Sequence, residues 1–441
     1  MPRVPTPLIH DADLPAGPVC VAFSGGLDST VLLHALSHAP RVRDQGLRAL
    51  HVHHGLHDQA DAWAAHCEQA CRAWGVPFSV RRVAVARTGI GPEAAARSAR
   101  RAAFAADLRP GESLALAHHR DDQAETVLMR ALRGAGPDGL TAMAASTPFA
   151  AGRLWRPLLD APRTALLAHA RAHGLAWIED PSNDDTRLDR NFLRRQVMPL
   201  VRQRWPHADA ALARLATLTG EAVALLDEGD AQALAQVATA DPRCLSRRAL
   251  LDLPAARRAR VLRRWIAALQ LPPLPGNGVA RIEADLLHAA PDAEACFEWH
   301  GARVRAWRDV VHAAPLRRPL PMDWQVPWCG DVPLALPGGG DLALQFTAGA
   351  YRFDTPVTVG GRRGGERITL PGRGHSHALK HVLQDLGLPP WERERMPLVR
   401  DADGTLLAAG DLVYSARFDA WLRGHGGRLR WRPDDASFAP D

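Results

Sequence analysis

The chain has 441 residues, of which 46% are hydrophobic and 23% are charged, and its formal net charge is +6. This composition is typical of a soluble globular protein with more than one domain, and the positive charge favours an anionic partner. No apolar run approaches the ~20 residues of a membrane span, and no basic-then-apolar leader opens the chain, so we expect a cytoplasmic protein without a membrane partner.

Strands and helices alternate over the first 134 residues. The predicted strands cover residues 18–23, 47–54, 78–85 and 113–119, and the predicted helices cover residues 29–39, 58–75, 91–108 and 121–134. This alternation predicts an α/β fold with a doubly wound parallel sheet. In such sheets ligands gather at the carboxyl ends of the strands, where Ser24–Asp28, His51–His54 and His118–Asp122 lie.

The rest of the chain predicts a different organisation. A short strand, a helix and an acidic loop follow Leu154, and the next helix, over residues 190–205, carries five arginines and no acid. Residues 206–290 read as Ala/Leu-rich helix, 296–314 as a β-hairpin and 315–324 as a linker before a small α+β module. We therefore expect a catalytic domain over residues 1–210, a mostly helical domain over 211–320 and a C-terminal module over 335–441.

The rare lysine and the scattered cysteines exclude several site types. Lys380 is the only lysine, and no Gly-rich segment supplies the G-K-S/T of a Walker A loop. Pyridoxal chemistry would have Lys380 alone available, so we set both classes aside. Cys67 and Cys71 beside His66 leave a metal pair open, with buried helix cysteines as the simpler interpretation. A zinc site at His51–His54 is disfavoured because adjacent strand residues point to opposite faces.

The stretch VAFSGGLDST (21–30) runs a strand directly into two glycines and a single acid. The backbone N–H groups of this turn, together with a helix beginning near Ser29, form an anion site without a cationic side chain. Asp28 would repel phosphate unless Mg²⁺ bridges the two, whereas an ordinary capped turn is the alternative. The turn therefore predicts a Mg·ATP site with Asp28 as the Mg²⁺ ligand. The predicted ATP contacts are Ser24, Gly25, Gly26, Leu27, Asp28 and Ser29.

SGGLDS resembles the PP-loop of the ATP pyrophosphatases, which cleave ATP to AMP and pyrophosphate while adenylating a substrate. Four further stretches are similar to the tRNA(Ile)-lysidine synthetase family, and residues 362–399 are similar to its C-terminal module. These four are LHVHHGLH (50–57), AHHRDDQAET (117–126), RGAGPDGLTAM (133–143) and IEDPSNDDTRLDRNFLRRQVMPLV (178–201). The resemblance runs from Val19 to Arg417. Ala142 stands where the family commonly has a glycine, and we expect the alanine to stiffen its loop. His57 stands where the family usually has an arginine, and we assign no role to it.

The resemblance implies a ligase that joins free lysine to C2 of the wobble cytidine in the CAU anticodon of an isoleucine tRNA. ATP adenylates the C2 oxygen, pyrophosphate leaves, and the lysine amine then displaces AMP. Because that amine is protonated at pH 7, its site must first recognise a cation. Asp122 and Glu125, three apart at the start of a helix, match the family's lysine-recognition acids and share one helix face.

The resemblance also implies roles for basic residues. His118 would contact phosphate or shuttle a proton, and Arg190 or Arg194 would stabilise charge on the phosphates, with a solvated basic face as the alternative. We expect Arg195, Arg373 and Lys380 to contact tRNA, the last two in the C-terminal module.

Two other functions stay open at this point. A tRNA thiolation enzyme on the same fold would need a catalytic cysteine or a CxxC set. This chain has no CxxC, and Cys67 lies in a predicted helix rather than in a site loop. A non-catalytic tRNA-binding protein would not need the intact SGGxDS. The sequence leaves the oligomeric state open, with a homodimer as one alternative.

Overall fold

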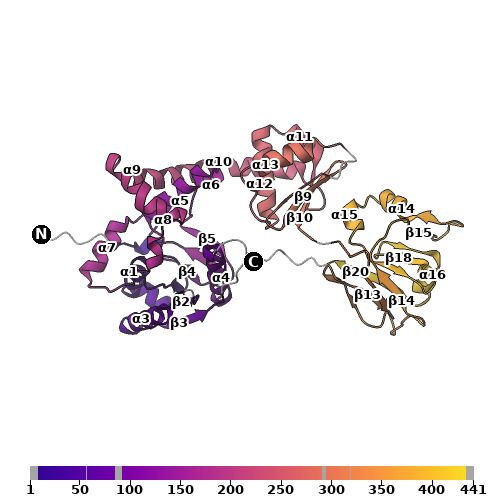
Figure 1. The fold of residues 1–441 in the computed structure, drawn as a ribbon, viewed down its shortest axis with the longest axis horizontal. Helices are drawn as coiled ribbons and strands as arrows, with labels where there is room; N and C mark the ends of the chain where they lie inside the picture. Colours follow the sequence, from indigo (N-terminus) through magenta and orange to yellow (C-terminus); the bar gives the residue numbers. More distant parts are fainter. Residues whose placement is uncertain (1–7, 56, 85–91, 291–294, 318, 434–441) are drawn as a thin grey trace. The chain divides into compact units, whose positions relative to one another are not determined.

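The computed structural model describes residues 8–55, 57–84, 92–290, 295–317 and 319–433, and the chain divides into two compact units, residues 1–228 and 229–440 (Figure 1). The first seven residues, Leu56 of the LHVHHGLH stretch, and Val85 at the end of the predicted third strand lie outside the described residues. Within the described residues, no helix is long and apolar enough to cross a membrane.

A six-stranded sheet forms the centre of the first unit, in the order β3-β2-β1-β4-β6-β5. The pairs from β3 to β6 are parallel, as the alternation predicts, whereas the edge strand β5 pairs antiparallel with β6. The strands are β1 (Val19–Ala22), β2 (Leu47–His53), β3 (Phe78–Arg82), β4 (Ser113–Ala115), β5 (Ser146–Phe149) and β6 (Gly152–Trp155).

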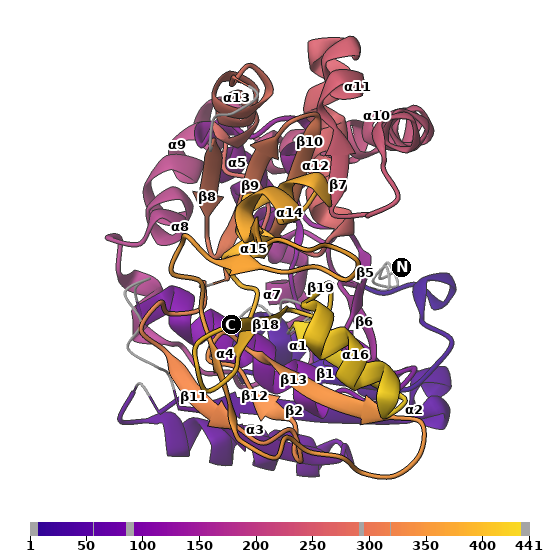
Figure 2. The same ribbon diagram turned by 90° about the vertical axis from the view of Figure 1, so that its right-hand side faces the viewer.

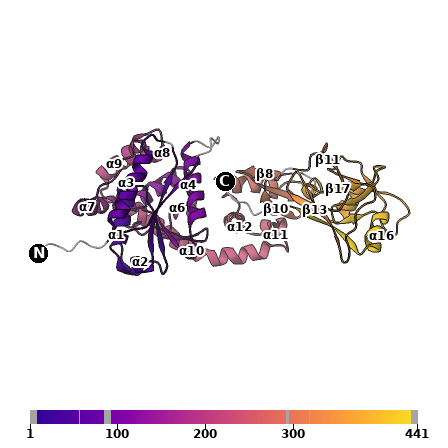
Figure 3. The same cartoon turned by 90° about the horizontal axis from the view of Figure 1, so that it is seen from below.

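Helices cover both faces of this sheet, because alternate residues of each strand point to opposite sides (Figure 3). Val19 and Val21 of β1 face a core shared with α1, α3 and α7, whereas Cys20 faces the core under α4. The helices are α1 (Leu27–Ser37), α2 (Pro40–Gln45), α3 (Ala60–Ala73), α4 (Pro92–Asp107), α5 (Arg120–Leu132), α6 (Pro137–Leu140) and α7 (Arg163–Ala172).

The predicted arginine-rich helix is interrupted. It begins as α8 (Asp189–Phe192), passes through a π-helical segment, Leu193–Val197, and continues as α9 (Met198–Arg204). Short 3-10 turns lie at Asp11–Asp13 and Pro181–Asp184, and the long helix α10 (Ala208–Val237) follows α9. Because π-helical segments often mark functional sites, this interruption directs attention to its arginines.

The first part of the second unit is a helical layer on a four-stranded antiparallel sheet of order β7-β10-β9-β8. The predicted hairpin over 296–314 is therefore three consecutive strands, and β7, which lies among the predicted helices, completes the sheet. The elements are β7 (Cys244–Ser246), α11 (Arg247–Asp252), α12 (Ala255–Ala268), α13 (Gly278–Arg281), a π-helical segment (Ile282–Leu287), β8 (Cys296–Trp299), β9 (Ala302–Trp307) and β10 (Val310–Pro315).

The C-terminal part of this unit is the expected small α+β module, with sheets of order β11-β14-β17-β18-β19, β12-β13-β20 and β15-β16. Phe418 and Leu422 of α16 pack in one core with residues of these strands. Helix α16 is labelled in Figure 2. The strands are β11 (Gln325–Trp328), β12 (Leu334–Ala335), β13 (Gly340–Phe346), β14 (Val357–Gly360), β15 (Arg367–Ile368), β16 (His377–Ala378), β17 (Leu398–Arg400), β18 (Leu406–Ala409), β19 (Val413–Tyr414) and β20 (Gly427–Pro433); the helices are α14 (Leu379–Asp385), α15 (Pro390–Arg393) and α16 (Ala416–Gly424).

Candidate active site

The order of the central sheet places the candidate site. β1 lies between β2 and β4, so the chain leaves β1 and β4 at the point where the strand order reverses. A doubly wound sheet opens a crevice at such a point, beyond the carboxyl ends of its strands. The SGGLDS turn follows β1, and His118–Asp122 follow the neighbouring strand β4, so both segments lie at the same edge of the sheet, where His119 contacts Asp28.

The SGGLDS turn is held by its own hydroxyl groups. Ser29 Oγ donates to the carbonyl oxygen of Gly26 at 3.1 Å and lies 3.0 Å from Ser24 Oγ, while Thr30 Oγ1 donates to the carbonyl of Gly25 at 3.2 Å. Helix α1 begins at Leu27, two residues earlier than predicted, with Gly26 as its N-cap. The Leu27 side chain is buried in the core, so only its backbone can face a ligand.

Gly25 cannot be replaced without moving the turn. Its φ is +83°, a conformation that favours glycine, and its carbonyl accepts the N–H of Ile178 at 2.9 Å. An added Cβ would lie 2.6 Å from Ile178 Cδ1 and 2.8 Å from Cys67 Sγ. The side chains of Ile178 and Cys67 therefore pack tightly against Gly25, and this packing fixes the backbone of the turn.

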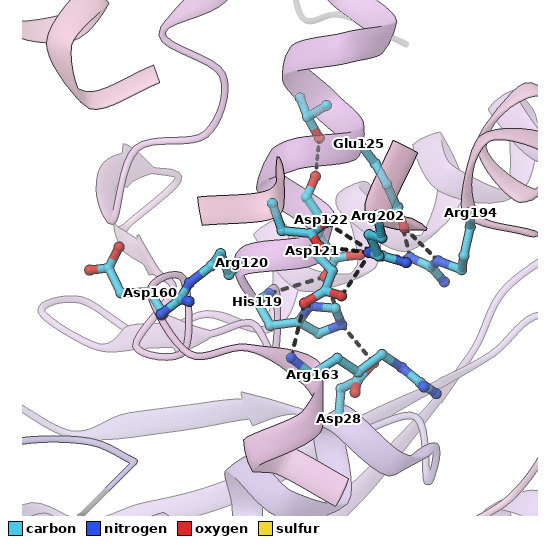
Figure 4. Close-up of polar contacts among 12 residues, drawn as sticks. Asp28, His119, Arg120, Asp121, Asp122, Glu125, Asp160, Arg163, Arg194 and Arg202 are labelled. Carbon is cyan, nitrogen blue, oxygen red and sulfur yellow. Dashed lines mark hydrogen bonds and ion pairs between the residues drawn. The ribbon is translucent and has the colours of Figure 1, made fainter. Parts of the chain in front are cut away.

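Asp28 has the features that a metal ligand needs. Its Oδ1 is buried and has no hydrogen-bond partner, and its Oδ2 lies 3.5 Å from Nε2 of His119 (Figure 4). A buried carboxylate oxygen without a partner is costly unless something occupies it. A hard cation such as Mg²⁺, which prefers carboxylate and phosphate oxygens, fits this atom.

His119 connects Asp28 to the acids of α5. The side chain is buried, and its Nε2 lies 3.5 Å from Asp122 Oδ2 as well. Burial lowers the pKa of His119, but the contact with Asp28 and the charges of Asp122 and Asp121 outweigh it, so the pKa is raised. The sequence analysis favoured the neighbouring His118, whose pKa burial lowers to about 4 and whose Nδ1 is buried without a partner.

Asp122 and Glu125 lie together on the first turns of α5 and are almost fully buried. Arg190 donates to Asp122 at 2.9 Å and to Glu125 at 3.0 Å, and Arg194 donates to the same two acids at 2.8 Å and 2.7 Å. Burial raises the pKa of Asp122, but the charges of His119, Arg190 and Arg194 hold it below its ordinary value. The two arginines therefore contact the same two carboxylates, and their predicted role at the phosphates stays a prediction.

A further acid joins this cluster to its surroundings. Asp121 accepts the backbone N–H of Arg163 at the start of α7 and the guanidinium of Arg202 from α9 (Figure 4). Arg202 also bridges to Asp209 at 2.6 Å. The site helix α5 is thus tied to both α7 and α9 by Asp121, a residue that the sequence analysis did not single out although it lies within the DDQAET motif.

Of the residues predicted to contact tRNA, Arg195 belongs to the same unit as this cluster. Arg195 forms an ion pair with Asp184 and donates to the carbonyl of Asn183 at 3.0 Å, so its guanidinium is held against the acidic loop. Arg373 and Lys380 belong to the second unit, where both side chains are exposed. Their role in binding stays a prediction.

The two metal sites left open by the sequence are not formed. Cys67 and Cys71 are buried, and burial raises the pKa of each thiol to about 12, which leaves both thiols neutral and unreactive. His51 donates through Nδ1 to the carbonyl oxygen of Phe23 at 2.9 Å, and His53 contacts Asp61. Across the described residues, no three His, Cys, Asp or Glu side chains are arranged to hold a metal ion.

Comparison with known proteins adds to this geometry. Three family models match the chain: a PP-loop domain over residues 7–201, a TilS substrate binding domain over 245–312 and a TilS substrate C-terminal domain over 357–431. The chain is 54% identical over 431 residues to the tRNA(Ile)-lysidine synthase of Xanthomonas axonopodis pv. citri (strain 306), which covers 97% of this chain and 96% of that one. The chain belongs to the tRNA(Ile)-lysidine synthase family. The predicted resemblance is therefore confirmed.

Other members of the tRNA(Ile)-lysidine synthase family match over nearly the same length. The tRNA(Ile)-lysidine synthase of Xylella fastidiosa (strain 9a5c) is 52% identical and covers 98% of this chain and 97% of that one. A crystal structure titled as the TILS C-terminal domain is 28% identical and covers 26% of this chain and all of that chain, with a TM-score of 0.21. Because the PP-loop domain is an ATP-using domain, this tRNA(Ile)-lysidine synthase family member uses ATP.

Proposed function

We propose that this chain joins free lysine to C2 of the wobble cytidine in the CAU anticodon of tRNA(Ile). The observation that carries the proposal is the buried pair Asp122 and Glu125, placed beside the PP-loop at one crevice of the sheet. A pair of carboxylates is a receptor for an ammonium group, and the PP-loop is a receptor for phosphates. Together they bring an amine to a base that ATP has activated.

The reaction balances in two steps. The C2 oxygen of cytidine attacks the α-phosphorus of ATP, and the bond to pyrophosphate breaks. The lysine side-chain nitrogen, after losing its proton, then attacks C2, and the C2–oxygen bond breaks to release AMP. The backbone N–H groups of Gly25 and Gly26 would bind phosphate oxygens, and Asp28 would hold a Mg²⁺ ion, which would supply neutralising charge to the phosphates.

We expect Arg190 and Arg194 to make different contacts before and after lysine binds. Arg190 and Arg194 form ion pairs with the two carboxylates that lysine needs. The ammonium of lysine competes with them for Asp122 and Glu125. Once displaced, the guanidiniums are free to turn toward the phosphates, and the charge of Asp28 already acts on Arg194. The phosphate role predicted for these arginines and the carboxylate contacts seen here then belong to successive states.

The second unit supplies residues that bind the tRNA. Arg373 and Lys380 are exposed and bind phosphates of the tRNA away from the anticodon, and Arg195 binds phosphates nearer the active site. The reaction needs free lysine and ATP, both of which are cytoplasmic metabolites, so we place the protein in the cytoplasm. A homodimer is compatible with this function and is not required by it.

The alternatives fit the geometry less well. A cytidine thiolase needs a reactive cysteine, whereas Cys67 and Cys71 are buried thiols whose pKa is raised to about 12. A non-catalytic tRNA-binding protein has no use for a buried Asp28 oxygen beside an intact phosphate turn.

Pyrophosphate exchange into ATP, stimulated by tRNA(Ile), tests the adenylation step. The intact chain should catalyse this exchange without lysine, and Asp28→Asn should lose it by about a hundredfold or more, because one oxygen–metal contact is removed at the phosphates. Asp58→Asn, at an exposed position of the same unit, is the matched control. Near-normal exchange by Asp28→Asn at ordinary Mg²⁺ would overturn the metal assignment, and no exchange by the intact chain would overturn adenylation.

A further inference from the structure

Four histidines gather where the C-terminal ends of α1 and α7 meet. His34 lies in the last turn of α1 and His38 caps that helix, while His169 lies in the last turn of α7 and His173 caps it. Each pair is four residues apart, so each pair shares one helix face. The two helices pack against each other in one core. The proposed lysine-ligation chemistry uses none of these residues.

Four of the six ring pairs in this cluster are close, and His34 belongs to three of them. The ring centroid of His34 lies 4.2 Å from that of His38, 5.2 Å from that of His169 and 4.7 Å from that of His173, and the centroids of His169 and His173 are 4.5 Å apart. Four imidazoles around a tetrahedral Zn²⁺, bound at about 2.0–2.1 Å, place their donor nitrogens about 3.3 Å and their centroids about 5 Å apart. The observed spacing falls close to these values.

The nitrogen atoms of the inner pair already face each other. His34 Nδ1 lies 3.0 Å from His169 Nε2, near the separation of two ligands on one metal ion. His38 directs its Nδ1 to the carbonyl of His34 at 2.9 Å, which leaves its Nε2 free and its ring oriented. A ligating histidine commonly donates its other nitrogen to a carbonyl in this way.

The surroundings favour a cation at this position. Both helices direct their C-terminal ends, which carry partial negative charge, at the cluster. His34 is buried and meets the edge of Trp74, whereas His38 and His173 are exposed and can turn. The cluster is therefore closed on its inner side and open to solvent on its outer side, as an entry path for an ion requires.

We propose that His34, His38, His169 and His173 bind one divalent transition-metal ion, with Zn²⁺ as the chemical class. Neutral imidazoles suit this class better than Mg²⁺ or Ca²⁺, which prefer oxygen ligands. Among the described residues the donor atoms are not yet arranged around one point, so the exposed rings of His38 and His173 rotate on binding. The ion joins the end of α1 to α7, the helix whose chain continues to Ile178 beneath the PP-loop.

Cobalt binding to the full chain, prepared without a polyhistidine tag and stripped with a chelator, tests this site. We expect one Co²⁺ per chain with the visible absorption of a four-coordinate nitrogen site, displaced by Zn²⁺, and a rise in Tm with added Zn²⁺. His38→Asn with His173→Asn changes only exposed side chains and should weaken binding by at least roughly tenfold.

The matched control is His375→Asn with His377→Asn, a pair in the other unit whose ring centroids lie 4.5 Å apart. This control should keep the affinity and stoichiometry of the intact chain. The proposal is wrong if the intact chain binds no Co²⁺ at micromolar concentrations, or if the His38/His173 variant binds it as tightly as the intact chain does.

Discussion

Asp122 and Glu125 are two acids taken almost completely out of water, and such groups are stable only when cations neutralise them. Arg190 and Arg194 do so through short contacts with both acids. The spacing DDQAE predicts that the two acids share a helix face, and they do. It cannot predict that arginines some 65 residues later in the chain cover them, because that contact depends on how α8 and the π-helical segment dock on α5.

Glu125→Gln should raise the lysine concentration needed for half-maximal activity by about ten- to a hundredfold, because a neutral amide loses a charge-assisted contact of roughly 1.5–3 kcal/mol with the ammonium. The KM for ATP should change little, since Glu125 does not reach the PP-loop. Glu68→Gln, on the exposed face of α3, serves as the control. Unchanged lysine dependence in Glu125→Gln would show that the acid serves only to hold the arginines.

The loop after α6 contains a residue with a positive φ, and this loop is hydrogen-bonded to helix α5. Ala142 has a φ of +51°, and its carbonyl accepts from Arg130 at 3.0 Å, while the next residue, Met143, exchanges two hydrogen bonds with the side chain of Gln123 on α5. The loop therefore supports the helix that carries Asp122. The sequence comparison identified Ala142 as a replaced glycine, and the positive φ gives the physical reason for glycine at this position.

Ala142→Gly should stabilise the first unit by about 0.5–1 kcal/mol, because the left-handed strain of an alanine, roughly 1–2 kcal/mol, exceeds the entropy that a glycine adds to the unfolded chain. Urea unfolding measures the difference. Ala144→Gly, two residues later and without a positive φ, is the control and should destabilise slightly. Equal losses of stability in both variants would contradict the strain at Ala142.

Helices and strands were predicted best where one hydrophobic periodicity runs through the whole segment. The alternating strands and helices of the first 134 residues are local patterns, and β1 to β4, α1, α3, α4 and α5 follow them, whereas the short helix α2 was not predicted. β7 was missed because three residues among helices carry no period of their own, and they form a strand only by pairing with β10, some 65 residues later. His119 was missed for a related reason, since only the docking of α5 against α1 brings it to Asp28.

At the scale of the whole molecule, we propose that the first unit carries out the chemistry and that the second binds tRNA. Arg373→Glu with Lys380→Glu should raise the KM for tRNA(Ile) several-fold and reduce the slope of log K against log salt by about two, because two phosphate contacts are lost. ATP binding, which belongs to the other unit, should be unchanged and is the internal control. An unaltered salt slope would mean that these two residues form only a solvated surface.

Mass spectrometry of nucleosides, after incubation of the chain with tRNA(Ile), ATP, Mg²⁺ and isotope-labelled lysine, tests the proposed function most directly. We predict one cytidine, at the wobble position, that carries the label through a new C2–nitrogen bond, with one AMP released for each label incorporated. Unmodified or sulfur-containing cytidine, in a sample where pyrophosphate has been released, would contradict lysine as the nucleophile and Asp122 and Glu125 as its receptor.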